Sequence, residues 1–221
     1  MTPAITELVK SMSSVTLGWA LGIGSALIIE RRKKRRKAKA IQIAVSMELR
    51  EVAHRLLGIA YKIEARLGGV NRELLEWMLP QIQRYAGPNP RDSLLASVGG
   101  LLQATDADLA KLAAYEQAHT PPQFLPQQEA SYATAVATEA HDFDPDYAVR
   151  LLDILSHIRM FNDTRESCLF YTRLTFTPGM TDENHRTLIQ NVDAADAALA
   201  NRARIIVDKI TALEEKYPHD E

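Results

Sequence analysis

Residues 12–29 read MSSVTLGWALGIGSALII, and after Glu30 residues 31–37 read RRKKRRK. The first segment contains no charged residue, and the second contains only basic residues. A helix of 18 residues is about 27 Å long at 1.5 Å per residue, which is close to the hydrocarbon thickness of a bilayer. The pattern therefore predicts a single transmembrane helix with positive charge at one end.

The positive charge also predicts an orientation. Eight Lys or Arg residues lie between Arg31 and Lys39, whereas the N-terminal tail contains only Lys10. Because basic residues stay on the cytoplasmic side, we expect an inner (cytoplasmic) membrane protein with its N-terminus outside. A cleavable signal would carry its charge before the apolar segment. We expect residues 1–30 to be the tail and span, 31–39 a basic collar, and 40–221 a cytoplasmic domain.

The collar is expected to contact lipid head groups, through Arg31, Arg32, Lys33, Lys34, Arg35, Arg36 and Lys37. Two other interpretations exist for the two segments. A basic run can bind nucleic acid or act as a nuclear signal, and an apolar segment of this length can be a buried core helix. Their adjacency argues against both, because a buried helix rarely ends in seven charges and a nucleic-acid arm needs no apolar segment.

Small residues recur at every fourth position of the predicted span, namely Ser14, Gly18, Gly22 and Ala26. This spacing places them in a nearly straight ridge on one helix face, and Gly18 with Gly22 forms a GxxxG motif. Close backbone packing through such a ridge favours a homo-oligomer. The ridge also resembles a glycine zipper, so a pore-forming membrane effector is an alternative.

Charge and cysteine content limit the function of the remaining chain. Residues 40–221 contain 17 basic and 26 acidic residues, a formal charge of −9. An acidic domain is a poor surface for nucleic acid, so no DNA partner is expected. The single cysteine, Cys168, excludes an intramolecular disulfide and agrees with a reducing cytoplasm.

Apolar periodicity in residues 38–221 predicts an all-α domain. Three helices of about thirty residues are expected to begin near Ala38, Pro145 and Thr181, with Asp144 and Thr181 as N-caps. The pair Gly68-Gly69 should end the first. Shorter helices are expected at 71–86, with a kink or break at Pro80, at 92–103, interrupted by Gly99-Gly100, at 105–119 and at 127–141. Residues 174–177 are the only candidate strand. The long helices are best satisfied by an antiparallel bundle.

Polar residues and one loop have alternative interpretations. Asn162, Asn191 and Asn201 interrupt the long helices, and we interpret them as surface positions or as mutually hydrogen-bonded amides that set register. Phe124 and Leu125 lie in a proline-bounded loop. They are either an exposed docking element or apolar residues folded over the bundle end.

Glu51 and His54 have the Glu-x-x-His spacing of di-iron sites in ferritin-like bundles. A functional site requires a second such pair, and the nearest, Asp182 with His185, lies in the first turn of a helix, where acids are expected. With 28 acids and six histidines, one such spacing arises by chance. We therefore expect no metal or other cofactor and interpret Glu48, Glu51 and His54 as a solvated face.

Arg150 and His157 lie on one face of a long predicted helix. Their Arg-x6-His spacing resembles that of HEPN-type helical ribonucleases, in which the arginine holds phosphate and the histidine acts on the ribose hydroxyl. The polar residue that usually follows the arginine is absent, since Leu151 stands there. The sequence contains no phosphate-binding glycine loop, nucleophile elbow or zinc spacing.

These observations favour a single-pass membrane protein over an enzyme. The leading hypothesis is a sensor, adaptor or scaffold that binds an unidentified protein through its helical bundle and self-associates through its membrane helix. The alternatives are an oligomeric pore-forming effector and a HEPN-like ribonuclease.

Overall fold

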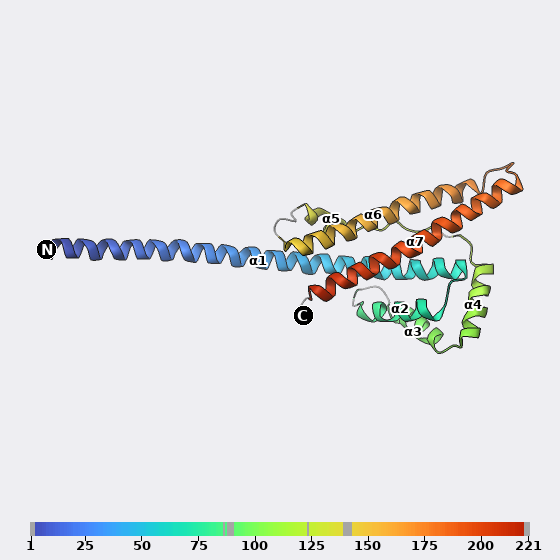
Figure 1. The fold of residues 1–221 in the computed structure, drawn as a ribbon, viewed down its shortest axis with the longest axis horizontal. Coiled ribbons are helices and arrows are strands. Elements are labelled where there is room, and N and C mark those ends of the chain that lie inside the picture. The colour runs from blue at the N-terminus through green and yellow to red at the C-terminus, as the bar shows by residue number, and fades with distance from the viewer. Residues whose placement is uncertain (1–2, 86, 88–90, 123, 139–142, 219–221) are drawn as a thin grey trace. The chain divides into compact units, whose positions relative to one another are not determined.

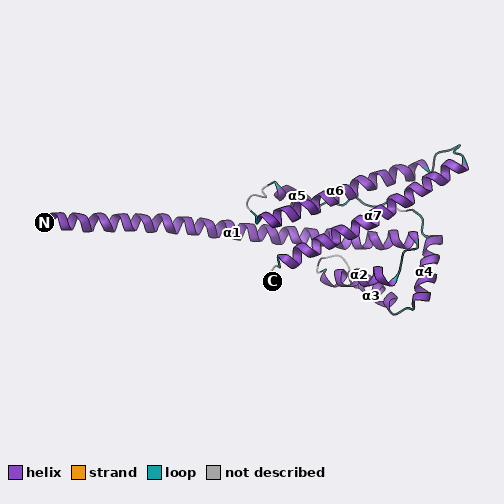
Figure 2. Cartoon of the chain, viewed as in Figure 1, coloured by secondary structure: helices purple, strands orange, loops and turns teal. Residues whose placement is uncertain are grey.

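The computed structural model describes residues 3–85, 87, 91–122, 124–138 and 143–218, with side chains for all of these except 3–28 and 91. Every regular element in these ranges is a helix, as Figure 2 shows. The prediction of an all-α fold is confirmed. The chain divides into two units, residues 1–43 and residues 44–221.

Helix α1 (Pro3–Leu67) runs without interruption through the expected span, the collar and the first predicted helix of the domain. For the expected span at 12–29, the structure describes the helical backbone but the side chain of Ile29 alone. Within the part of the chain that was described, no helix is long and apolar enough to cross a membrane.

Glycine ends α1 as the sequence predicted. Gly68 has a φ of 73°, in the left-handed region that an L side chain rarely adopts. The N–H of Gly69 donates to the carbonyl of Glu64 at 2.7 Å. This is the hydrogen bond of a Schellman ending, which satisfies a carbonyl that the helix leaves free.

Three long helices form the bundle in the second unit: α1 from residue 44, α6 (Pro145–Leu174) and α7 (Asp182–Lys216). Two ion pairs show that α7 is antiparallel to α1, because Arg50 pairs with Glu214 and Arg66 pairs with Asp196. Figure 1 shows α6 and α7 side by side and antiparallel, with the connecting turn at 175–181. The predicted antiparallel bundle is confirmed.

The core follows the predicted three- and four-residue spacing. Side chains from α1, α6 and α7 interdigitate, as expected for helices that each bury one apolar stripe. The fully buried positions include Val45, Leu49, Val52 and Leu56 from α1, Leu151, Ile154 and Phe161 from α6, and Leu199, Ile206 and Ile210 from α7.

Four shorter helices cover this bundle: α2 (Arg72–Arg84), α3 (Arg91–Leu102), α4 (Asp106–His119) and α5 (Ser131–Ala137). Helix α2 packs on α7, where the Trp77 indole N–H donates to Asp208 at 2.8 Å. The Thr211 hydroxyl donates to Gln81 at 2.7 Å. Helix α3 packs against α2, and α5 packs against α6.

Several local predictions were wrong. Helix α3 continues through Gly99 and Gly100 to Leu102, and α2 continues through Pro80, so the chain does not break there. Helix α5 begins at Ser131, four residues after the predicted start, and the end predicted near residue 141 lies outside the described residues. The candidate strand at 174–177 is the end of α6 and a turn.

Candidate interaction surfaces

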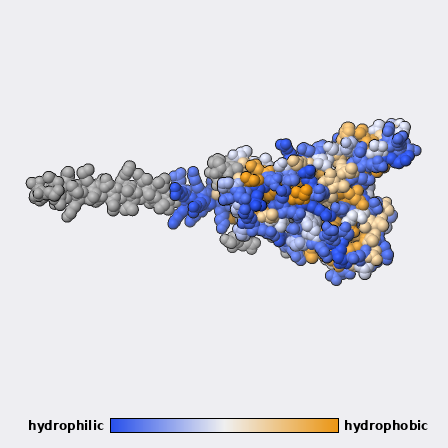
Figure 3. All heavy atoms as spheres, in the orientation of Figure 1, coloured by the Kyte–Doolittle hydropathy of each residue, from blue (hydrophilic) through white to orange (hydrophobic). Residues whose placement is uncertain are grey.

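All seven basic residues from Arg31 to Lys37 lie on α1 with exposed side chains. Seven consecutive helical residues cover about two turns, so these side chains point in every direction around the helix axis. Figure 3 shows the segment as continuous hydrophilic surface. A helix that lies flat on a membrane instead gathers its charges on one face.

The ridge residues Ser14, Gly18, Gly22 and Ala26 are within α1, and their side chains lie outside the described residues. A spacing of four residues on a continuous helix advances each residue by about 40° around the axis. Residues 14–26 of α1 are helical throughout, so the four positions share one side of the helix.

Glu51 and His54 form part of a packed interior contact. The His54 ring stacks on Tyr85 from the end of α2, with centroids 3.9 Å apart and planes at 9°. The Tyr85 hydroxyl donates a short hydrogen bond to the Glu51 carboxylate. Burial lowers the pKa of His54, although the Glu51 charge opposes this. The interpretation of these two residues as a solvated face was wrong, because Tyr85 covers them.

Glu48, one turn earlier, was also wrongly interpreted as solvated. Its carboxylate accepts hydrogen bonds from the backbone N–H groups of Tyr132 at 3.0 Å and Ala133 at 2.7 Å. These N–H groups open α5, which has no N-cap side chain of its own. Glu48 therefore fixes α5 to α1 by capping it from another helix.

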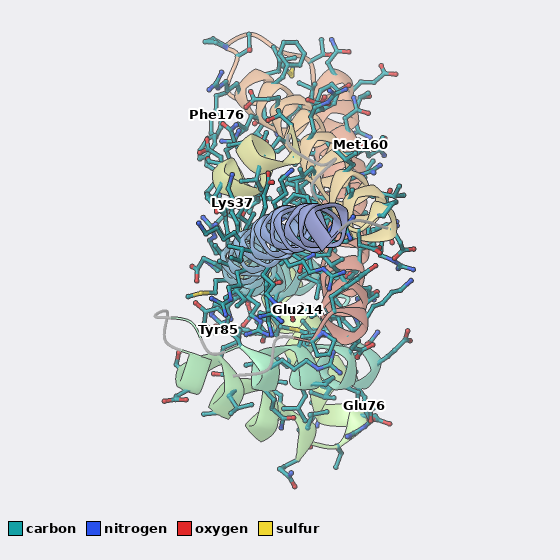
Figure 4. The ribbon with its side chains drawn as sticks, turned by 90° about the vertical axis from the view of Figure 1, so that its left-hand side faces the viewer. Lys37, Glu76, Tyr85, Met160, Phe176 and Glu214 are labelled. Carbon is teal, nitrogen blue, oxygen red and sulfur yellow. The ribbon has the colours of Figure 1, made fainter. Side chains whose placement is uncertain are left out.

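Ion pairs near His54 join three helices, α1, α2 and α7. Arg50 Nε lies 2.7 Å from Glu214 Oε1, and Arg84 lies 2.7 Å from Glu215. Burial raises the pKa of Glu214, while Arg50 and Arg84 act in the opposite direction. Figure 4 labels Tyr85 and Glu214 on α2 and α7. The cavity among these residues is about 20 Å³, enough for about one water molecule, and the described residues contain no metal-binding group of three or more ligands.

The Arg150 guanidinium is paired within the bundle. Its Nε donates to Asp146 at 2.8 Å. The same carboxylate lies 2.8 Å from Lys216 Nζ and accepts from the Tyr217 hydroxyl at 2.9 Å. Hydrogen bonds from Lys216, Arg150 and Tyr217 lower the pKa of Asp146. Arg150 is thus part of the contact that joins the start of α6 to the end of α7.

His157 has different partners from Arg150. Its Nδ1 lies 3.3 Å from Arg202 Nη1, and its Nε2 lies 3.7 Å from Asp153. Since arginine can only donate, Nδ1 accepts and the ring proton is assigned to Nε2. Burial lowers the pKa of His157 against the opposing effect of Asp153. Arg150 is therefore paired with Asp146 of its own helix, whereas His157 contacts Arg202 of α7.

A groove of about 900 Å³ lies between α6 and α5 with its preceding loop. Leu152 and Leu155 contribute its apolar side from α6, and Ala130 and Ala135 line the α5 side. Sequence periodicity did not identify the groove, because it depends on where the loop before α5 lies.

Two hydrogen bonds position that loop on α6. The Asn162 amide donates to the Gln128 carbonyl at 2.7 Å, and the Gln128 N–H donates to the Asn162 side-chain oxygen at 3.0 Å. Asn162 is therefore neither a free surface residue nor paired with another asparagine. Leu125 is buried, as expected for a residue folded over the bundle, whereas Phe124 is 66% exposed.

Comparison with known protein families, with curated proteins and with solved structures gives no match to this chain.

Proposed function

We propose that this chain is a single-pass protein of the inner (cytoplasmic) membrane whose helical bundle acts by protein contacts, as a sensor, adaptor or scaffold. One observation carries the proposal. An uncharged apolar segment passes directly into a two-turn ring of exposed basic side chains on the same continuous helix.

The ring of charge supports a crossing orientation of α1 rather than a flat one. Head groups surround a helix that passes through the membrane surface, and the collar presents basic groups on every side. Each such charge adds about 1 kcal/mol of attraction to anionic lipid near the surface. The same collar, by the positive-inside rule, keeps residues 40–221 in the cytoplasm.

Self-association through the span is the second part of the proposal. Between helices in lipid, close packing of small residues replaces the hydrophobic force. Ser14, Gly18, Gly22 and Ala26 provide such a face along α1. A dimer or small oligomer would double each contact that the attached bundle can make.

The contacts of the described domain favour binding over catalysis. Arg150 and His157 are held by Asp146 and by Arg202 with Asp153. Tyr85 stacks on His54 and donates to Glu51, and it also lines the small cavity beside His54. These polar groups join helices to one another, which is what a rigid platform for partner proteins requires.

The test uses the full-length protein in membranes. Alkaline carbonate washing should leave it in the pellet, and a reporter fused to the C-terminus should read cytoplasmic. Crosslinking in detergent should give a defined oligomer that Gly18→Leu with Gly22→Leu disrupts. Gly24→Leu is the matched control, because Gly24 lies off the ridge. Recovery in the soluble fraction would overturn the anchor, and equal crosslinking of all variants would overturn the ridge.

A second candidate function rests on the same ridge, since a glycine zipper can close several helices into a pore. In that case expression should dissipate the membrane potential and release an enclosed dye. The Gly18→Leu, Gly22→Leu variant should abolish leakage, whereas Gly24→Leu should not. An intact membrane potential in cells that express the wild type would exclude this candidate.

A further inference from the structure

Helix α6 exposes apolar side chains along one face, and Leu152 of this face also lines the groove. Val149 is 67% exposed, Leu152 is 49% exposed and Met160 is 45% exposed. With Ser156 they follow a spacing of three, four and four residues, which is one face of a helix. Met160, which Figure 4 labels, is the last residue of this face, and its sulfur accepts from Arg202 of α7 at 3.1 Å.

One cation and one anion lie at the groove beside this face. Arg159 and Glu129 both line the groove, and both are exposed. Among the residues that the structure describes, neither forms an ion pair, although Asp163 lies one turn along α6 from Arg159. The neighbouring Arg165, in contrast, pairs with Glu166.

The two charges lie at similar levels of α6. The side-chain oxygen and nitrogen of Asn162 both bond to the backbone of Gln128, and Asn162 is three residues, or about 4.5 Å, along α6 from Arg159, so Glu129 lies about one turn from Arg159 along the helix axis. This level matters for symmetry. A two-fold axis parallel to α6 keeps every residue at its own level, so only groups at equal levels meet across it.

We propose that this face, formed by α6 from Val149 to Met160 with the α5 groove, binds the same face of a second copy of the chain. Arg159 of each copy pairs with Glu129 of the other, and the exposed apolar side chains of each α6 enter the groove of its partner. The charges favour a second copy of the chain as the partner. A contact with two-fold symmetry forms two Arg159–Glu129 pairs, so both charges of each copy are paired. The inference deepens the proposed self-association and rests on it for the high local concentration of copies.

The first experiment reports on this face alone. Ser156→Cys in the full-length protein places a thiol near the proposed axis, and oxidation should form a disulfide-linked dimer. Ala212→Cys, on the exposed side of α7, is the matched control and should crosslink at least about tenfold less. Cys168 is buried and contributes little to either. Equal crosslinking at both positions would overturn the proposal.

The second experiment exchanges the charges in the Ser156→Cys background. Arg159→Glu alone and Glu129→Arg alone should each reduce the crosslink about tenfold, because both contacts become like-charged. An equal mixture of the two variants should regain it, since a mixed pair has two opposite-charge contacts. Such recovery cannot arise within one chain. Arg186→Glu and Glu76→Arg, at exposed positions elsewhere, should have no effect.

The outcomes separate this inference from the proposed function. Failure of the mixture to regain the crosslink, with carbonate resistance and the effect of Gly18→Leu, Gly22→Leu intact, would overturn the α6 face and leave the anchor and ridge in place. Loss of membrane association with the Ser156→Cys crosslink retained in solution would overturn the anchor and leave the α6 face in place.

Discussion

Arg66 and Asp196 form an ion pair in the interior of the bundle, where the last turn of α1 meets α7. Arg66 Nε donates to Asp196 Oδ2 at 2.9 Å, and Nη2 makes an ionic contact with the same oxygen at 2.6 Å. Asp193 holds Nη1 at 2.7 Å. Asp196 is only 3% exposed, so this pair determines the level at which α7 docks on α1.

Removing one partner of this pair should strongly destabilise the domain. Arg66→Ala is expected to lower the free energy of unfolding by about 3–5 kcal/mol, because it leaves the Asp196 carboxylate buried without a counter-charge. Chemical denaturation measures this. Asp106→Ala, which breaks the exposed Arg72 pair, should cost less than about 1 kcal/mol. Similar losses in the two variants would contradict the assignment.

Glu48 is expected to control the stability of α5. Glu48→Gln removes the charge that caps Tyr132 and Ala133, and the expected cost is about 1 kcal/mol. Hydrogen exchange should accelerate by about fivefold at residues 131–137 and remain unchanged in α7. Glu76→Gln, at an exposed position of α2, provides the control. Uniform acceleration along the whole chain would instead indicate global destabilisation.

Tyr85 is expected to contribute through two separable contacts. Tyr85→Phe keeps the ring that stacks on His54 and removes only the hydrogen bond to Glu51, so a loss of about 1–2 kcal/mol is expected. Tyr85→Ala removes both contacts and should cost about 3–5 kcal/mol. Denaturant titration of the two variants distinguishes the contributions. A Phe variant as stable as wild type would show that the hydroxyl contributes nothing.

Cys168 is expected to be unreactive in the folded protein. Burial, together with the charge of Asp196, which accepts from Sγ at 3.2 Å, raises the pKa of its thiol to about 12. At pH 8.5 a thiol reagent should label the native protein at least about 100-fold more slowly than the unfolded chain. Rapid labelling without unfolding would contradict the buried position.

The raised pKa of Cys168 also predicts a pH dependence. Folding favours the neutral thiol, so this contribution to stability is fully present below the pKa of the unfolded chain, near 8.5, and is lost as the pH rises toward about 12. The denaturation midpoint should therefore fall between pH 8 and pH 10. Cys168→Ala should show a smaller decrease over the same range.

Local sequence signals predicted the helices well, because their causes are local. Thr105, Asp144 and Thr181 each accept a hydrogen bond from the first turn of the helix that they begin. Such caps require only residues two or three positions apart. Gly68 ended α1 for an equally local reason, its positive φ.

The errors in the predicted fold come from tertiary packing. Gly99 and Gly100 lower helix propensity, but α3 packs on α2 and continues through them. Packing of this kind involves a second helix, so propensity within one segment does not report it.

The sites were less predictable than the fold, since their partners are distant in the chain. Spacing alone paired Glu51 with His54, whereas the contact that defines both comes from Tyr85. The loop that carries Glu129 to the side of α6 depends on Asn162, thirty-four positions after Gln128. The sequence alone indicated that Asn162 is a surface residue or an amide that sets register with another asparagine.

The arrangement of the collar has a mechanical consequence for the proposed anchor. Charge spread evenly around a helix resists movement along the axis, because sinking or rising moves every group away from the head groups. Such a ring of charge does not resist rotation, since the contacts with the head groups are the same at every rotation angle of the helix. In the proposed membrane the collar would fix the depth of α1 and leave its rotation to the small-residue ridge. Under the proposed function, twisting rather than movement along its axis would be the motion by which this helix transmits a signal.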